Sequence, residues 1–193
     1  MPKWSRRILR MSVVIIAFDL SGCYSSRAYK GDGRLQDSGP FAFAPRYVIS
    51  LSELDFGVEG ERNFSFNGAP PAPMTLTLRL TQSQEPVALS DAAWSELWED
   101  LHHAGTFVRA DLLRSDGSAA CSVASPLAGG WVPAGLGADK PGLMYRYFWH
   151  HGCCDIHLTP GEQYHFRVTV SSTAGGRPLI MTPTLEGGGW DSP

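Results

Sequence analysis

The sequence predicts an all-β sandwich of about seven to eight strands with one short inserted helix. Glycine and proline are frequent, with 21 and 14 copies among 193 residues, and both favour turns over long helices. Several short segments alternate apolar and polar residues, which is the period of a strand with one buried face. Turn signals between these segments recur at the spacing expected between the strands of a sandwich.

The first 22 residues are predicted to be a lipoprotein signal peptide. Basic residues precede a short apolar segment, 11–20, that is interrupted only by Asp19 and is too short to span a bilayer. The sequence Leu20-Ser21-Gly22-Cys23 follows and resembles the lipobox of bacterial lipoproteins. This resemblance implies that Cys23 becomes the lipid-bearing first residue and that the protein is anchored to a membrane.

Tyr24, rather than aspartate, follows the expected lipidated cysteine. By resemblance to lipoprotein sorting in enterobacteria, this residue implies an outer-membrane location facing the periplasm. Residues 23–45 are rich in serine, glycine, aspartate and arginine without a sustained period, which predicts a flexible tether. A single domain is expected over residues 46–190.

The expected mature chain is acidic. The whole sequence has 16 Lys+Arg and 19 Asp+Glu. Residues 1–22 hold four of the basic and one of the acidic residues, so 12 basic and 18 acidic residues remain, a formal charge of −6. Such a surface disfavours nucleic acid and anionic lipid, and it suits a basic protein partner.

The first half of the domain contains three segments that we expect to be strands, at 46–53, 63–66 and 74–81. The last has the clearest alternation: apolar residues at even positions from Met74 to Leu80 alternate with Thr75, Thr77, Arg79 and Thr81. We therefore expect the Met74 to Leu80 face in the core.

A helix is predicted at about 91–102. Ser90 can cap its first turn, and Trp94, Leu97, Trp98 and Leu101 recur with helical spacing. Burying such a stripe stabilises by about 1.5–3 kcal/mol per side chain, which is sufficient to dock one short helix on a sheet.

Strands are also expected at 106–114, 118–124, 144–150 and 178–185, with an Asp-Gly hairpin turn after the first. Residues 125–143 are rich in glycine and proline, and no strand is predicted there. Trp131 within this segment either anchors a partner or folds back over the end of the sandwich. We favour packing, although Trp131 is kept as a candidate binding residue.

The segment from Leu158 to Tyr164, Leu-Thr-Pro-Gly-Glu-Gln-Tyr, followed by alternating apolar residues, resembles the tyrosine corner of fibronectin type III and related immunoglobulin-like sandwiches. The resemblance implies an immunoglobulin-like sandwich in which the ring of Tyr164 is buried and its hydroxyl returns to a backbone group upstream. The predicted helix is not part of the basic pattern of that family, so it is interpreted as an insertion.

Strand register continued backwards from this corner places Cys154, Ile156 and Leu158 on the inward face. In an oxidising compartment, Cys121 is expected to form a disulfide with Cys154, and Cys153 is the alternative partner. A bond between the two adjacent cysteines ranks last because it would be strained.

The outward residues of the same stretch, Cys153, Asp155 and His157, are candidate binding residues. With His150, His151 and His165 they offer the donors that zinc or copper prefers. No spacing among them matches a closed zinc pattern, so the sequence predicts no metal site. Motifs for a serine nucleophile, a metalloprotease, a phosphate loop or a dinucleotide fold are also missing from the sequence. We therefore expect a non-catalytic protein without a cofactor.

A protein-binding module tethered to the outer membrane fits these features. The chain also loosely resembles small lipoproteins of Gram-negative bacteria, some of which neutralise antibacterial toxins in the periplasm, and this resemblance implies an immunity role. Two alternatives are a structural part of an envelope or secretion assembly and a binder of carbohydrate or metal.

Overall fold

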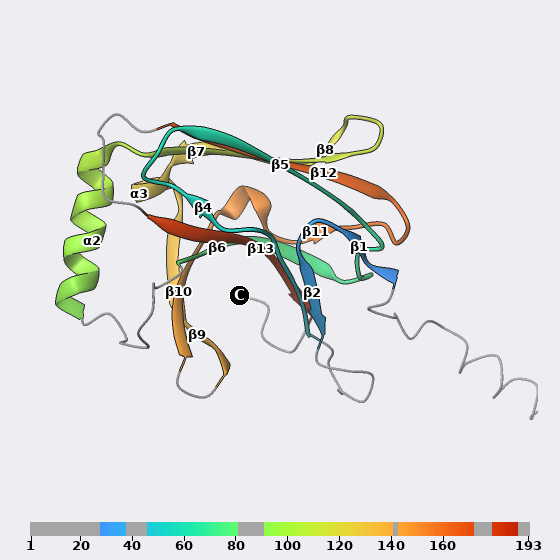
Figure 1. Ribbon diagram of the computed structural model, residues 1–193, viewed down its shortest axis with the longest axis horizontal. Helices are drawn as coiled ribbons and strands as arrows, with labels where there is room; N and C mark the ends of the chain where they lie inside the picture. The colour runs from blue at the N-terminus through green and yellow to red at the C-terminus, as the bar shows by residue number, and fades with distance from the viewer. Residues whose placement is uncertain (1–27, 38–45, 81–90, 141–142, 172–178, 189–193) are drawn as a thin grey trace, which may run out of the picture.

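The short alternating segments pair into two antiparallel sheets that face each other across one core (Figure 1). The computed structural model describes residues 28–37, 46–80, 91–140, 143–171 and 179–188. The predicted signal peptide and the expected lipid site, Cys23, lie outside these residues. The predicted all-β sandwich is confirmed.

The first sheet has five strands in the order β1-β5-β12-β7-β8. Their bounds are β1 (Lys30–Gly31), β5 (Gly60–Asn67), β12 (Gln163–Ser171), β7 (Phe107–Arg114) and β8 (Ala119–Pro126).

The second sheet has eight strands, with the order β2-β3-β13-β6-β10-β9 and with β11 beside β6 and β4 beside β13. Their bounds are β2 (Arg34–Asp37), β3 (Arg46–Ser50), β13 (Ile180–Gly188), β6 (Pro73–Leu80), β10 (Leu143–Trp149), β9 (Val132–Lys140), β11 (Ile156–His157) and β4 (Leu54–Asp55).

Thirteen strands are described, more than the seven to eight that the sequence predicted. Most of the additional strands are short, and a two-residue segment such as β1 or β4 has no readable alternation. β9 crosses the glycine- and proline-rich segment 125–143, where no strand was predicted. Pairing with β10, rather than strand propensity, holds this segment extended.

The folded part of the chain begins earlier than the predicted boundary at Arg46. β1 pairs with β5 in the first sheet, and β2 pairs with β3 in the second. Residues 28–37 were predicted to belong to the flexible tether 23–45. They are instead part of the sandwich, and they contact both of its sheets.

Aromatic rings from neighbouring strands fill the core side of the first sheet. Phe64 stacks on Phe166 with ring centroids 6.2 Å apart, and Phe66 stacks on Tyr164 at 5.7 Å. Both pairs follow the register of β5 with β12. Each such pair contributes about 0.5–1.5 kcal/mol beyond the burial of its area.

The corner that precedes β12 is fixed by Tyr164. Its ring is buried, and its hydroxyl accepts a hydrogen bond from the backbone N–H of Thr159 at 2.7 Å and donates one to Glu162 Oε2 at 3.0 Å. The two bonds join the tyrosine to the turn immediately upstream. The direction in which the chain enters β12 is thereby set.

The predicted helix is present as α2 (Asp91–Ala104) and stands at one end of the sandwich (Figure 1). Trp98 stacks on Phe148 of β10, with ring centroids 5.9 Å apart and planes 11° from parallel. The side chains of the other predicted core positions, Trp94, Leu97 and Leu101, lie outside the described part. Neither α2 nor α3 (Leu127–Gly130) has the length and apolar character of a membrane-spanning helix.

Candidate functional site

The stretch from His150 to His157 is not one continuous strand. It begins with the 3₁₀ turn η2 (His151–Cys153), and only Ile156 and His157 pair with β6. Between these two parts, Asp155 has a φ of 57°, in the left-handed region. A residue in this conformation turns the chain, so the alternation of inward and outward side chains does not extend through it.

The disulfide joins Cys121 of β8 to Cys153 of η2, with the Cα atoms 5.4 Å apart. The preferred prediction, pairing with Cys154, is wrong, and the alternative partner is the one used. The reason is the turn at Asp155, which places Cys153 in the core and leaves Cys154 half-buried. The Cys154 thiol donates to the carbonyl oxygen of His150 at 3.3 Å. Burial and the charge of Asp155 raise the pKa of this thiol, so it stays protonated near neutral pH.

The three candidate binding residues that were predicted to share the outward face, Cys153, Asp155 and His157, therefore do not lie on one face. Asp155 and His157 lie side by side on the surface, with Oδ1 and Nε2 3.7 Å apart, and both side chains are about three-quarters exposed. Cys153 is fully buried in the disulfide. An exposed pair of this kind contributes little to stability and does not form a closed binding site.

The neighbouring histidines are engaged in local contacts. His150 Nδ1 accepts a hydrogen bond from the N–H of Gly152 at 2.9 Å, and burial together with the charge of His151 lowers the His150 pKa. His165 lies on β12, with Nδ1 3.0 Å from Ser65 Oγ. Within the described ranges, no group of three His, Cys, Asp or Glu side chains is placed to hold a metal ion.

Trp131 is a core residue. Only 1% of it is exposed, and its ring meets His150 edge-on at a centroid distance of 5.7 Å. The packing interpretation of this tryptophan is confirmed, and its candidacy as an exposed partner anchor is wrong.

The outward face of the five-stranded sheet carries a fixed ionic cluster around Asp111. This carboxylate accepts hydrogen bonds from Arg109 at 2.8 Å, Arg167 at 3.2 Å and Ser122 at 2.6 Å. Burial would raise its pKa, but the bonds from Ser122 and the two arginines outweigh burial and lower it. The cluster ties β7, β12 and β8 together across the sheet.

A second ionic cluster lies on the outward face of the eight-stranded sheet. Glu186 of β13 accepts from Arg79 Nε at 3.0 Å, Arg46 Nη2 at 2.9 Å and Thr77 Oγ1 at 2.9 Å. The hydroxyl of Thr77 also contacts that of Thr184. Burial would raise the pKa of Glu186, but the charge and hydrogen bond of Arg79 outweigh it, so the pKa is lowered. This cluster ties β3, β6 and β13 together.

The strongest candidate for a binding site is an acidic cavity of about 270 Å³ where the chain passes from β4 into β5. Its walls come from residues 53–62 and from the end of β12. The lining residues are Glu53, Leu54, Asp55, Val58, Glu59, Gly60, Glu61, Arg62, Val168 and Val170.

Two of the four carboxylates in the cavity have structural hydrogen bonds. Asp55 Oδ1 accepts from the N–H groups of Gly57 and Leu179, each at 2.8 Å, and Glu61 accepts from Asn63 at 3.1 Å. Glu53 and Glu59 are exposed, and neither has a hydrogen bond or an ion pair within the described part of the chain. These two carboxylates are therefore available to a ligand.

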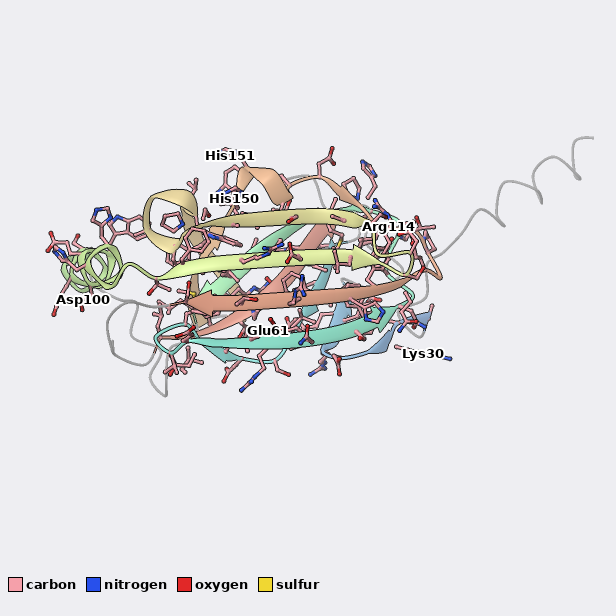
Figure 2. All side chains as sticks on the ribbon, turned by 90° about the horizontal axis from the view of Figure 1, so that it is seen from above. Lys30, Glu61, Asp100, Arg114, His150 and His151 are labelled. Carbon is pink, nitrogen blue, oxygen red and sulfur yellow. A yellow bond between two sulfur atoms is a disulfide. The ribbon has the colours of Figure 1, made fainter. Side chains whose placement is uncertain are left out.

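Three valines contribute apolar surface to the lining of the cavity. Val168 and Val170 come from β12 and are buried, while Val58 at the rim is 59% exposed. Figure 2 looks onto the five-stranded sheet and shows Glu61 toward its β5 side and His150 and His151 beyond its β8 side. The acidic cavity and the histidine-rich stretch thus lie at opposite margins of this sheet.

No known protein family has a model that matches this chain, and no curated protein is significantly similar to it.

The sequence contains a signal for this cavity in a cluster of acidic residues. Glu53, Asp55, Glu59 and Glu61 place four acids within nine residues, with Val58 among them. The signal is weak because a run of charges is ordinarily a solvated loop. Only the fold shows that β12 closes one side of this loop.

Proposed function

We propose that the protein is a non-catalytic protein-binding module, held at the outer membrane by lipid on Cys23 and facing the periplasm. The observation that supports this most directly is the acidic cavity formed by residues 53–62 and β12. In the proposed complex, the cavity receives a lysine or arginine side chain of a basic protein.

The size of the cavity suits a single side chain. Sites for drug-sized ligands and cofactors measure about 300–1,000 Å³, and this cavity measures about 270 Å³. A lysine or arginine has an apolar stem and a charged head. The stem fits against the exposed Val58, and the head fits the carboxylates of Glu53 and Glu59.

The charge of the whole chain supports the same kind of partner. The expected mature protein has a formal charge of −6, from 12 basic and 18 acidic residues. An acidic protein attracts a basic partner over a distance of about 10 Å at 0.1 M salt, which accelerates encounter. We infer that the partner is a periplasm-acting antibacterial toxin with a basic surface, so that the protein confers immunity.

The test is protection in living cells. Each protein encoded beside the gene is exported to the periplasm of a sensitive strain, with and without this protein, and survival is counted. We expect survival with the intact protein and loss of protection when both Glu53 and Glu59 are replaced by glutamine. The matched control replaces Glu96 and Glu99 of α2, which removes the same charge from an exposed helix and should preserve protection.

Two results would contradict the proposal. One is that no neighbouring gene product is toxic in the periplasm or bound by the purified domain. The other is that both double variants protect equally well, because the cavity would then have no part in binding. Replacing Cys23 by serine tests the anchor separately, since protection should fall while binding by the purified domain is unchanged.

A further inference from the structure

The outward face of the five-stranded sheet, which is the face seen in Figure 2, holds two arginines on one carboxylate. Arg109 Nε and Arg167 Nη2 both donate to Oδ2 of Asp111, at 2.8 and 3.2 Å. Because the two guanidinium groups share one acceptor atom, they lie next to each other. Arg109, Asp111 and Arg167 are called the arginine patch below.

The arginine patch has more positive charge than its buried carboxylate needs. Burial would raise the pKa of Asp111, but the hydrogen bonds from Ser122 and the two arginines outweigh burial and lower it, so the carboxylate is ionised at neutral pH. One counter-ion satisfies a buried carboxylate that has further hydrogen bonds. The second arginine places a like charge beside the first, which is unfavourable until another anion approaches. The patch therefore attracts an anion.

The two guanidinium groups keep most of their N–H donors available to a ligand. The side chains of Arg109 and Arg167 are 56% and 41% exposed, whereas that of Asp111 is 4% exposed. Within the described part of the chain, each arginine makes only its one bond to Asp111. Arg109 uses Nε for that bond, so its two terminal nitrogens remain. These nitrogens form a fork that binds a carboxylate through two parallel hydrogen bonds.

An exposed aromatic side chain lies on the same strand and the same face as the patch. Positions 107, 109 and 111 of β7 alternate with the core positions 108, 110 and 112. Phe107 therefore lies outward, two residues from Arg109, and is 38% exposed. Aromatic and arginine side chains are enriched at protein interfaces and among the residues that contribute most to binding. This combination indicates a surface that contacts a protein.

We propose that the arginine patch binds an aspartate or glutamate side chain of the partner protein, and that the partner lies across the outward face of the five-stranded sheet. The inference rests on the proposed protein-binding function and adds to the acidic cavity a second contact of opposite charge. A free small anion on this exposed surface would compete with water and salt. A carboxylate carried by a protein is favoured, because the contacts around it exclude water from the ion pair.

Strand register gives the charge pattern that the partner carries. Glu61, in the lining of the cavity, lies opposite Thr169 of β12, and Thr169 lies opposite Arg109 of β7. Glu61 and Arg109 are therefore two strand spacings apart, about 10 Å. The partner accordingly has a basic side chain for the cavity and an acidic side chain about 10 Å from it. Two contacts of opposite sign fix the orientation of the partner and disfavour proteins that offer only the basic one.

The first test needs no partner protein. A blocked peptide of six glutamates is titrated at low salt into the mature chain carrying Cys23→Ser, and the arginine Nε–H signals are followed by NMR. We expect saturable shifts at Arg109 and Arg167 but not at Arg34, an exposed arginine of β2. Arg109→Gln should weaken peptide binding about two- to fivefold, as expected for an exposed ion pair. The matched control Arg34→Gln should leave it unchanged.

Single substitutions separate binding from folding. Arg109→Gln leaves Arg167 as the counter-ion of Asp111, and Arg167→Gln leaves Arg109. Each single variant should therefore keep a cooperative thermal transition, whereas the double variant should unfold at a clearly lower temperature because the buried carboxylate loses both counter-ions. If either single variant fails to fold, both arginines are required by the carboxylate, and the excess charge on which the inference depends does not exist.

The second test uses whichever protein encoded beside the gene is bound by this one. Arg109→Glu should weaken that complex tenfold or more, because two like charges meet where water is excluded. Arg34→Glu makes the same change of charge on β2 and should have little effect. Reversing the partner's acidic residue to lysine should restore binding to Arg109→Glu and weaken binding to the unsubstituted protein.

Three results would overturn the inference. They are a glutamate titration without shifts at the patch, equal partner binding by Arg109→Glu and Arg34→Glu, and shifts at the patch that follow protein concentration without peptide, which would assign the surface to a second copy. Failure here is distinguishable from failure of the proposed function. A protein that needs Glu53 and Glu59 but not Arg109 to bind its toxin loses only this inference. A protein whose patch binds the glutamate peptide, but which protects against no toxin, loses only the immunity function.

Discussion

Replacing both Cys121 and Cys153 by alanine should lower the free energy of unfolding by about 4 kcal/mol. The disulfide closes a loop of 32 residues between β8 of one sheet and the turn that follows β10 of the other. The loop-closure entropy that a crosslink of this span removes from the unfolded chain corresponds to about 4 kcal/mol at 25 °C. For a domain of this size, such a loss lowers Tm by about 8–16 °C.

The assay is thermal unfolding of a soluble version that begins after Cys23, followed by circular dichroism. The matched control is Cys154→Ala, which keeps the crosslink and removes only the half-buried free thiol. It should change Tm by no more than about 2–4 °C. A reductant should lower the Tm of the unsubstituted protein and of this control alike, and it should leave the double variant unchanged.

Thiol counting gives an independent check on the pairing. Under denaturing conditions without reductant, the soluble version should show one reactive thiol, from Cys154. Three reactive thiols would show that no disulfide forms. A large loss of stability in Cys154→Ala, with Cys153→Ala close to the unsubstituted protein, would refute the assignment of Cys153 as the partner.

Three further changes test other parts of the structure. Tyr164→Phe should lower the free energy of unfolding in urea by about 0.5–1.5 kcal/mol, because the partly buried hydrogen bond from the N–H of Thr159 is lost; an unchanged midpoint would show that the corner is held by packing alone. Glu186→Gln should lower the free energy of unfolding by on the order of 3 kcal/mol at neutral pH, because the buried guanidinium of Arg79 loses its ion pair with Glu186. The folded pKa of Glu186 is lowered, so its ionic cluster stabilises above the ordinary glutamate pKa and is lost as pH falls toward the folded value. The difference between this variant and the unsubstituted protein should therefore shrink on going from about pH 7 to about pH 3, and a constant difference would contradict the ionic account. Asp155→Gly should keep or raise Tm, because glycine adopts positive φ without strain, whereas Asp155→Val should lower it; the opposite order would show that the carboxylate itself is required.

The fold class was predictable because its signals are local. Segments such as 74–81 carry their own alternation, and α2 carries its own apolar stripe, so neither depends on knowing the partner strand. The predicted helix, 91–102, begins at the same residue as α2 (Asp91–Ala104) and ends two residues before it. The same reasoning could not find β1 and β2, which are short and owe their extended form to strands far along the chain.

The disulfide shows a second limit of pattern reasoning. Period-two alternation was carried from Leu158 back to Cys154, but it holds only while every residue is extended. One residue with positive φ, Asp155, was enough to exchange the places of the two cysteines. Aspartate is among the few residues that tolerate this conformation, yet nothing in the sequence marks which aspartate adopts it.

The early strands β1 and β2 begin the folded part of the chain close in sequence to Cys23, the expected lipid site. If Cys23 carries lipid as expected, only four residues, 24–27, lie between the anchor and Ala28, the first described residue, and the five Cα–Cα steps span at most about 18 Å. The linker between the lipid anchor and the folded domain would then be short. β2 and β9 are the two ends of a six-strand row, about 24 Å apart at the usual strand spacing (Figure 1). The β9 edge of this sheet is therefore the edge farthest from the early strand β2.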